Sequence, residues 1–426
     1  MDKLIIKLSL AIIIILALIN QIKSKTIKCP KLTKRGQNQP SRVYIVLLKN
    51  SGLKSSSLDN NNDENIKTMH FQVLESCFKL DIIKTTDLIA SSLINSPKTV
   101  LDISVPGCMT GYIGNFPANV AGSLKTLPEV SIIEPDSKLK IADVQNNPPS
   151  NLDRIDQPSF PLNKKYTYPS KAGNNVNTFV VDSGINVKHV DFGGRAKWFA
   201  TYCTGCPNID DNGHGTSVAS IIGGKTYGVA KKTALYAVKI LNKAGSGDLS
   251  SAMRAFSDIL KFHKNNKNKN TIVNLSLSGG KSQALDSAVG TLADNGIHVI
   301  VAAGNDYKGD ACAKSPSGSN RVITVGALNT NNNYLADFSN VGSCVTLFAP
   351  GVNIPCAGPS SSKNIISKTG TSQAAPHVAG AVALIISVNG NKSPDQMKAL
   401  IINLSTKNVI VGLDSRTPNR ILRINS

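Results

Sequence analysis

Three short segments of the sequence carry side chains that suit acid–base and nucleophilic chemistry. Asp182 ends an apolar run in the motif VVDSG, and a carboxylate that leaves such a strand is partly buried and has to be paired. His214 lies between two glycines in DNGHGT, so that backbone and a ligand can come close to its imidazole ring. Ser372 follows Gly370-Thr371 and opens a run of small residues. A carboxylate, an imidazole and a hydroxyl are the groups that nucleophilic catalysis by a serine requires.

Each segment alone has a plainer explanation. An aspartate at the end of a strand is more often a cap or turn residue, and a single histidine is more often structural. The serine has further support, because the amino end of a helix offers a partial positive charge and free N–H groups to an oxyanion. Pro376 is expected in the first turn of that helix, where proline is tolerated. The order Asp182, His214, Ser372 on one frame is stronger evidence than any single segment.

Hydrophobic patterning predicts the elements that position these residues. From residue 177 onward, apolar runs typical of buried strands alternate with segments of helical spacing. We expect strands at 178–181, 235–241, 271–277, 298–302 and 322–325, and helices near 214–222, 249–263, 282–295, 372–388 and 394–403. The alternation predicts an α/β fold whose parallel sheet is covered by helices on both faces. In such sheets the chemistry lies at the carboxyl ends of strands and the amino ends of helices.

A separate small unit is expected before this frame, over residues 41–142. Apolar runs at 43–48, 99–105, 109–116 and 130–134 predict strands, and 69–80 and 116–127 predict helices. The order strand, helix, strand, strand, helix, strand predicts a small α+β sandwich of the split β-α-β, ferredoxin-like type. Residues 25–40, which are basic and polar without periodicity, predict a disordered lead-in.

The amino terminus predicts export. Residues 1–24 combine early lysines, an apolar stretch and a small residue at the end, which is typical of a signal peptide. The apolar stretch of about a dozen residues is short of the ~20 that span a bilayer, and an uncleaved anchor is the alternative. We therefore expect a secreted protein without a membrane span. The formal net charge is +20, but the lysines are scattered without interleaved aromatic residues, so no nucleic-acid partner is expected.

The motifs VVDSGI, DNGHGT, GTSQAAPHVAG and VAAGN resemble those of the subtilisin-like serine proteases, in particular the proteinase K-type branch. The resemblance covers roughly residues 43–420. It implies a subtilisin-like fold with a seven-stranded type of parallel sheet, and a serine endopeptidase. It also implies that Ser372 is the nucleophile, His214 the general base and Asp182 its orienting partner. Asn305 matches the side-chain donor of the family's oxyanion hole, with the Ser372 backbone N–H as the second donor.

The resemblance also implies a substrate groove. One segment would pair with the substrate backbone, and two would form the walls of the pocket for the residue before the cut: Gly245, Ser246 and Gly247 for the edge, and Ser276, Leu277, Ser278, Ala302, Ala303 and Gly304 for the walls. These walls are small and neutral, which predicts an apolar or aromatic preference with broad tolerance. Asp248 is the one acid singled out that could favour basic residues near the edge segment.

The small unit, 41–142, resembles the inhibitor-type propeptide of the family. Residues 143–426 would then be the catalytic domain, and self-cleavage is expected near Ala142–Asp143. The expected partners are polypeptide substrates and the chain's own propeptide, and the mature enzyme is expected to be a monomer. Thr346 stands where proteinase K-type enzymes have a calcium-binding aspartate, and a neutral hydroxyl is a weak ligand for a hard cation. That calcium site is therefore not carried over and no cofactor is expected, while structural calcium at another position is left open.

Five of the eight cysteines lie in the catalytic region. Cys312 and Cys344 match a disulfide seen in relatives of this branch. The pairing of Cys203, Cys206 and Cys356 is open, and their odd number predicts one free thiol. Two glycosylation sequons begin at residues 391 and 403, and their use is open.

Two other functions compete with a broad endopeptidase. A selective precursor-processing convertase is disfavoured, because no extra β domain fits after about residue 410 and no acidic pocket signature is present. A catalytically silent surface or coat protein is disfavoured, because the three triad residues and Asn305 are all present.

Overall fold

The computed structural model describes residues 42–49, 67–68, 70–75, 77, 81–83, 99–102, 104, 110–136 and 142–424. The chain divides into two compact units, Met1–Leu139 and Lys140–Ser426. The predicted signal peptide and the lead-in lie outside the described residues, as does most of the loop region of the first unit. The expected boundary at residues 142 and 143 lies close to this division.

The first unit contains a five-stranded sheet with the strand order β2-β3-β4-β1-β5. Neighbouring strands are antiparallel except β2 and β3, and the unexpected β2 adds a parallel edge strand. The bounds are β1 (Arg42–Leu48), β2 (Asp81–Ile83), β3 (Thr99–Asp102), β4 (Gly111–Phe116), α4 (Ala118–Leu124) and β5 (Val130–Pro135). Val46, Leu74, Tyr112, Phe116 and Leu124 are in its core. The ferredoxin-like description of this unit stays a prediction.

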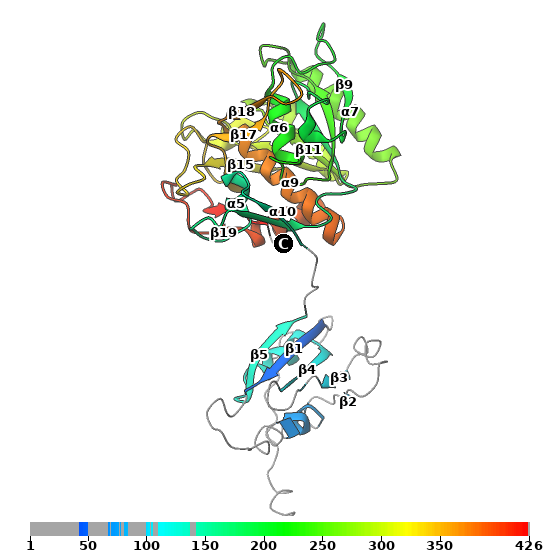
Figure 1. Ribbon diagram of the computed structural model, residues 1–426, viewed down its shortest axis with the longest axis vertical. Helices are drawn as coiled ribbons and strands as arrows, with labels where there is room; N and C mark the ends of the chain where they lie inside the picture. Colours follow the sequence, from blue (N-terminus) through cyan, green and yellow to red (C-terminus); the bar gives the residue numbers. More distant parts are fainter. Residues whose placement is uncertain are drawn as a thin grey trace, which may run out of the picture. The chain divides into compact units, whose positions relative to one another are not determined.

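The second unit is built on a nine-stranded sheet with the order β19-β20-β16-β15-β13-β11-β8-β10-β9 (Figure 1). The seven strands from β16 to β9 are all parallel, which confirms the predicted sheet. Their bounds are β8 (Asn177–Asp182), β9 (Ala196–Thr201), β10 (Ala234–Lys239), β11 (Thr271–Leu275), β13 (His298–Ala302), β15 (Ile323–Leu328) and β16 (Leu347–Pro350). Two antiparallel strands of two residues each, β19 (Thr406–Lys407) and β20 (Arg420–Ile421), complete one edge, where β20 pairs with β16.

Two of the seven parallel strands, β9 and β16, were not predicted, and neither were the short strands β19 and β20. The edge strand β9 is mostly half-buried and mixes lysine and threonine with apolar residues, so it lacks the continuous apolar run of its neighbours. The strand β16 has only four residues and ends in a proline. A short strand whose burial depends on distant neighbours leaves a weak signal in its own sequence.

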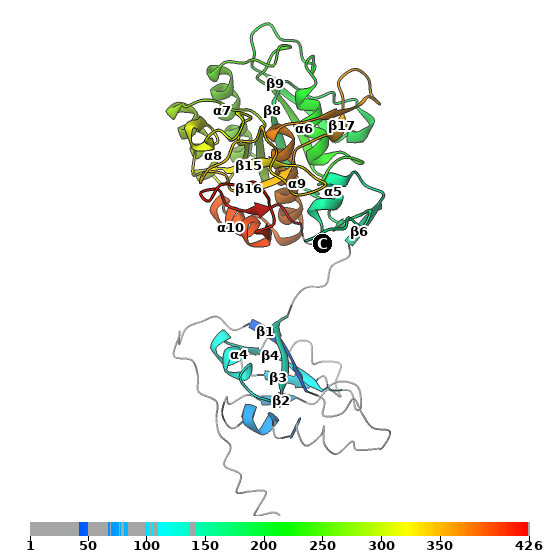
Figure 2. The same cartoon turned by 90° about the vertical axis from the view of Figure 1, so that its left-hand side faces the viewer.

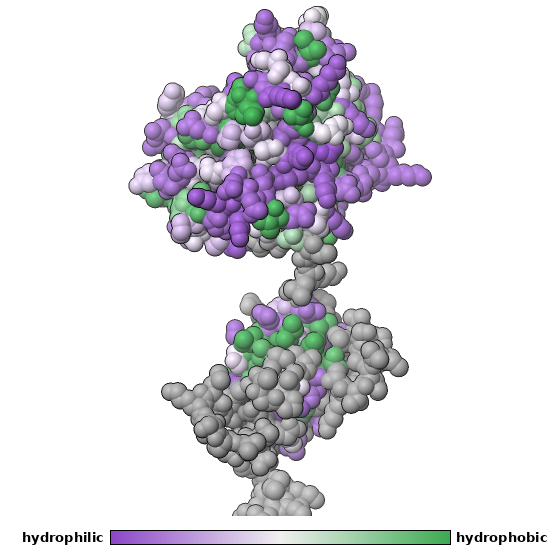
Figure 3. Space-filling view, viewed as in Figure 1, coloured by the Kyte–Doolittle hydropathy of each residue, from purple (hydrophilic) through white to green (hydrophobic). Residues whose placement is uncertain are grey.

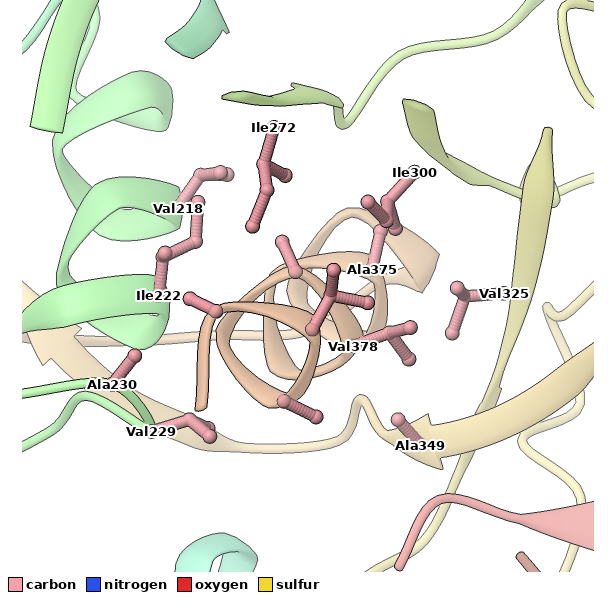
Figure 4. Close-up of a cluster of buried hydrophobic side chains, with 14 of the residues drawn as sticks. Val218, Ile222, Val229, Ala230, Ile272, Ile300, Val325, Ala349, Ala375 and Val378 are labelled. Atoms are coloured by element: carbon pink, nitrogen blue, oxygen red, sulfur yellow. The ribbon is translucent and has the colours of Figure 1, made fainter. Parts of the chain in front are cut away.

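Helices cover both faces of the sheet (Figures 1 and 2). On one face lie α5 (Ser150–Ile155), α6 (His214–Gly223), α9 (Thr371–Asn389) and α10 (Pro394–Leu404), and on the other lie α7 (Leu249–Asn265) and α8 (Gln283–Asp294). On the α6 and α9 face, Val218 and Val378 pack with Ile272, Ile300 and Val325 of the sheet (Figure 4). On the other face Phe256, Ile259 and Val289 pack against Phe179 and Val273.

The helix α9 is the central helix of this unit. By length and composition alone it could cross a membrane, but 78% of its apolar window is buried inside the protein, as expected of a core helix. The face of the second unit seen in Figure 3 is largely hydrophilic with scattered hydrophobic residues, as on an ordinary globular surface.

Pro376 lies at the sixth position of α9, so the prediction that it stands in the first turn was wrong. Proline has no N–H, and a helical residue at this position would normally donate to the carbonyl of Ser372, four residues earlier. The carbonyl oxygen of Ser372 is therefore available to another donor.

The contact between α9 and the end of α6 depends on Gly380. A Cβ atom placed on Gly380 would lie 2.6 Å from Val229 Cβ and 3.0 Å from the carbonyl oxygen of Ile222. Only a residue without a side chain permits this approach.

We predict that Gly380→Ala lowers the free energy of unfolding of the second unit. Overpacking costs about 1–3 kcal/mol, which outweighs the roughly 1 kcal/mol that alanine gains over glycine in a helix. Gly290→Ala in α8 is the matched control, because its Cβ would meet nothing closer than Arg321 Cγ at 3.6 Å. Urea unfolding of both variants checks this, and equal stability of the two would contradict it.

Candidate active site

A buried carboxylate and an imidazole form the centre of the site. Asp182 ends β8 and is fully buried, and His214 is the first residue of α6. The His214 Nδ1 atom lies 2.8 Å from Asp182 Oδ1 and 2.9 Å from Oδ2. The backbone N–H of Ser183 also donates to Oδ1, at 2.7 Å. Because a carboxylate only accepts hydrogen bonds, Nδ1 carries the proton and Nε2 has its lone pair available as a base.

The charge of Asp182 raises the pKa of His214 above its ordinary value, while burial of the ring opposes this. The pair therefore stabilises the imidazolium form relative to a histidine in water. A general base becomes positively charged when it accepts a proton, and the Asp182 carboxylate stabilises that charge on His214.

A second aspartate, Asp210, holds the loop in front of α6. Its two oxygens accept hydrogen bonds from the Ser183 hydroxyl, from the N–H groups of Asn212, Gly213 and Thr216, and from the Thr216 hydroxyl. The Ser183 hydroxyl in turn accepts from the Gly215 N–H at 2.9 Å. Asp210 was missed in the sequence, although an acid just before a glycine-containing turn is a recognisable cap signal.

A buried lysine supports the same junction. Lys239 at the end of β10 is fully buried, and its ammonium group donates to the Ser183 carbonyl and to Asp211 Oδ1, both at 2.7 Å. Lys239 thus links the end of β10 to the residue after β8 and, through Asp211, to the loop before α6. Removing Asp211 would leave the buried ammonium charge uncompensated. No sequence signal identified Lys239, because it lies at the end of an ordinary strand.

Ser372 is the second residue of α9 and is half-buried. Its hydroxyl donates to the Ser276 carbonyl, and the Ser276 hydroxyl donates to the Ser372 carbonyl, both at 2.9 Å. The second bond uses the carbonyl that Pro376 leaves available. Within the described residues, the Ser372 hydroxyl is not hydrogen-bonded to His214. The two residues stand at the amino ends of α9 and α6, which pack against each other (Figure 4).

Two N–H donors meet beside Gly370. The Asn305 Oδ1 atom accepts from the N–H and the hydroxyl of Thr371, each at 2.9 Å, which fixes the amide and turns Nδ2 the other way. A Cβ atom placed on Gly370 would lie 3.6 Å from Asn305 Nδ2 and 3.7 Å from the Ser372 backbone nitrogen. The arrangement can donate two hydrogen bonds to one oxygen. Thr371 was not singled out in the sequence.

The two expected pocket walls adjoin each other. Ser276, Leu277 and Ser278 follow β11, while Ala302 ends β13 and Ala303 and Gly304 follow it. A Cβ atom on Gly304 would lie 3.1 Å from Ser278 Oγ, so the two segments touch.

The expected edge segment lies in the exposed turn between β10 and α7. The Asn242 N–H donates to the Ser246 carbonyl within this turn, which includes Gly245 and Gly247. The Asn212 side chain donates to the Lys243 carbonyl at 2.9 Å and so links the turn to the loop of His214.

One acid beside the pocket was missed. A Cβ atom on Gly304 would lie 3.2 Å from Asp306 Oδ2. The Asp306 carboxylate accepts from Asn340 Nδ2 at 2.7 Å and pairs with the Lys314 ammonium at 3.0 Å, and these two bonds lower its pKa. Lys314 stands opposite Gly280 in the small ladder of β12 (Gly279–Gly280) and β14 (Lys314–Ser315).

The five cysteines of this unit form two disulfides and leave one free thiol. Cys312 and Cys344 form the disulfide that the resemblance implied. Cys203 and Cys206 are bonded to each other, which resolves the pairing left open in the sequence. Cys356 is the predicted free thiol, and burial raises its pKa to about 12, so it is inert as a nucleophile.

No cluster of three or more histidine, cysteine, aspartate or glutamate residues able to hold a metal ion is found in the part of the chain that the structure describes. The expectation that the protein uses no cofactor stays a prediction from the sequence.

Comparison with known proteins agrees with these features. Residues 173–420 match the subtilase family, peptidase S8. The chain is 41% identical over 309 residues to the subtilase-type proteinase isp6 of Schizosaccharomyces pombe, covering 71% of this chain and 65% of that protein. It is 41% identical over 338 residues to the subtilisin-like serine protease Pen ch 18 of Penicillium rubens, covering 74% of this chain and 68% of that protein. The matches thus span about two thirds of these relatives.

A solved structure is also similar. The crystal structure of a cold-adapted subtilisin-like serine proteinase matches with a TM-score of 0.62 and 37% sequence identity. The match covers 66% of this chain and 100% of that chain.

We predict that Asp182→Asn lowers the pKa of His214, because the amide removes the charge that raises it and leaves the burial that lowers it. Titration of the ring by NMR in the full chain measures this. Asp258→Asn is the control, since Asp258 lies on α7 and pairs with Lys261 instead. A pKa of His214 that did not move in Asp182→Asn would refute the electrostatic coupling.

Proposed function

The chain belongs to the subtilase family of serine endopeptidases, and we propose that it is a secreted enzyme of broad specificity, made as a precursor that cuts off its own first unit. The observation that carries the proposal is the Asp182–His214 pair, whose Nε2 is available as a base, together with the two donors beside Gly370.

In the proposed mechanism Ser372 is the nucleophile. Its hydroxyl turns from the Ser276 carbonyl toward His214, which requires rotation about a single bond between staggered positions. His214 Nε2 takes the hydroxyl proton as Oγ attacks the peptide carbonyl, and the imidazolium then gives that proton to the leaving amine. Asp182 keeps the proton on Nδ1 and stabilises the imidazolium, without itself becoming protonated.

The negative oxygen of the tetrahedral intermediate would lie beside Gly370. Asn305 Nδ2 and the Ser372 N–H would donate to it, with the positive end of α9 behind them. Losing one such donor costs about 10²–10³ in kcat, the magnitude known for the equivalent asparagine of subtilisin itself. Loss of the amine breaks the C–N bond and leaves the acyl group as an ester on Ser372. Water then attacks this ester and gives a proton to His214 Nε2, which returns a proton to the Ser372 oxygen as the acid product leaves.

We expect a preference for apolar or aromatic residues before the cut. The walls contribute small, neutral side chains, and an extended substrate bound through its backbone is read with little side-chain selection. The carboxylate of Asp306 would favour basic residues, but Lys314 neutralises it. This ion pair is the local reason to expect a neutral pocket rather than the acidic pocket of a convertase.

Secretion and self-cleavage are supported by separate features. The disulfides at Cys203–Cys206 and Cys312–Cys344 fit an oxidising compartment, and the second also favours the proteinase K-type branch. Strand β6 (Ala142–Asn146) pairs with β7 (Lys165–Pro169) within the second unit, so a cut near Ala142–Asp143 leaves a strand that is held in place. A parallel sheet is slow to form, which gives a propeptide a role in assisting folding.

A fluorophosphonate probe tests the nucleophile. We expect labelling at Ser372 in the wild-type chain and in the control Ser287→Ala, whose serine is exposed on α8, and none in Ser372→Ala. Ser372→Ala should also accumulate as full-length precursor, whereas the secreted wild type should begin near residue 143 by N-terminal sequencing. Absent labelling of folded wild type favours a silent surface protein, and normal processing of Ser372→Ala would assign the cut to another protease.

Substituting Lys314, the cation that pairs with Asp306, tests whether this ion pair keeps the substrate pocket neutral. Lys314→Met should raise kcat/KM for substrates with Lys or Arg before the cut, relative to Phe, by about 2- to 5-fold, because an exposed pair is worth about 0.2–1 kcal/mol. Lys308→Met is the control, because it removes another exposed lysine that lies two positions after Asp306 in the sequence. An unchanged ratio in an active Lys314→Met enzyme would show that Asp306 does not face the substrate.

A further inference from the structure

A polar pocket lies beside Thr346, where the resemblance to proteinase K-type enzymes places a calcium-binding aspartate. It has a volume of about 310 Å³ and is lined by Ser319, Asn320, Ser343, Cys344, Val345, Thr346, Lys398, Ile402, Pro418 and Arg420. The lining comes from α10, from β20 and from the segments that lead into β15 and β16 (Figure 2).

The carbonyl groups at this pocket are bound by a side-chain cation. The Lys398 ammonium on α10 donates to the Val322 carbonyl at 2.8 Å and to the Asn320 carbonyl at 3.1 Å. Backbone carbonyls that converge on one point are typical ligands of Ca²⁺, so this is the position where a hard cation would bind. The ammonium group occupies it.

A second side-chain cation, Arg420, binds the backbone carbonyl of Thr346. The Arg420 guanidinium on β20 donates to the Thr346 carbonyl at 3.4 Å. The Thr346 hydroxyl accepts from the Thr324 N–H at 3.2 Å, and so its lone pairs are partly used within the sheet. Neither oxygen of Thr346 is left as a ligand of the kind that an aspartate would supply.

No carboxylate is found among the described residues that line this pocket. The nearest acid on α10, Asp395, is exposed and pairs with Arg321, which itself adds positive charge near Lys398. A divalent ion would therefore meet two fixed cations and no negative ligand, and like charges a few ångströms apart repel each other by several kcal/mol at the effective dielectric of a protein surface. The residues do not fit calcium.

We propose that the Lys398 ammonium replaces a structural metal ion here, as a tethered cation that holds the segment 320–322 against α10. A tethered charge has a fixed local concentration, whereas a bound ion stabilises the fold only as far as its free concentration exceeds its dissociation constant. The inference rests on these contacts and on the fold, and is independent of the proposed activity.

The thermal midpoint of the second unit tests this in the full chain carrying Ser372→Ala, which avoids self-digestion. We expect the same Tm in excess EDTA and in millimolar CaCl₂. Lys398→Ala should lower Tm by about 3–6 °C, because it removes two hydrogen bonds from a charged donor. Lys407→Ala, which removes an exposed lysine of β19, is the control and should leave Tm unchanged. A rise of several degrees with calcium in this background, or an unchanged Tm in Lys398→Ala, would overturn the proposal.

A double variant tests whether the position is a cation site. Lys398→Ala combined with Thr346→Asp frees the two carbonyls and supplies the missing carboxylate, so CaCl₂ should raise its Tm by about 5 °C at about 100 times the dissociation constant, and EDTA should reverse this. Lys398→Ala alone should respond less. A double variant that folds and ignores calcium would overturn the assignment of a cation position.

Discussion

The site depends on one constraint, a carboxylate buried at the end of a parallel strand. Asp182 is fully buried, and a charge in that position is tolerated only when it is paired and hydrogen-bonded. The imidazole of His214 supplies the partner, and its N–H fixes which nitrogen remains basic. Asp210 holds the loop before α6, and Lys239 binds the Ser183 carbonyl that follows β8, so both support the segments that carry this pair.

The amino ends of two packed helices supply the other half of the site. His214 begins α6 and Ser372 lies in the first turn of α9. Thr371 holds the Asn305 side chain by its oxygen, so the Asn305 Nδ2 donor and the Ser372 N–H both lie beside Gly370. Pro376 contributes by lacking an N–H, which leaves the Ser372 carbonyl to the Ser276 hydroxyl. The small residues of α9 permit the close approach to α6, and at Gly380 a side chain would collide with Val229 and with the carbonyl of Ile222.

Lysines bind acidic side chains or backbone carbonyls at several points of the second unit. Lys239 pairs with Asp211 under the site, Lys314 pairs with Asp306 beside the pocket, and Lys398 binds two carbonyls near Thr346. The net charge of +20 is thus more than a surface bias, since some of these side chains take structural positions. The positions of these side-chain cations are set by the fold.

The sequence by itself determined the order of the three reactive residues, the alternation that makes a parallel sheet, and, through family resemblance, the Cys312–Cys344 bond. These features are visible because they are encoded in local spacing or in long motifs. The short strands β9 and β16, the role of Asp210 and Lys239, the Asp306–Lys314 pair and the Lys398 contacts were decided by tertiary structure. The Asp306–Lys314 pair joins residues only eight positions apart. The other features depend on residues that are more distant in the chain, such as Lys239 and Ser183, 56 positions apart, and Lys398 and Val322, 76 positions apart. Local patterns cannot encode such contacts, because only the folded sheet and its helices bring those residues within bonding distance.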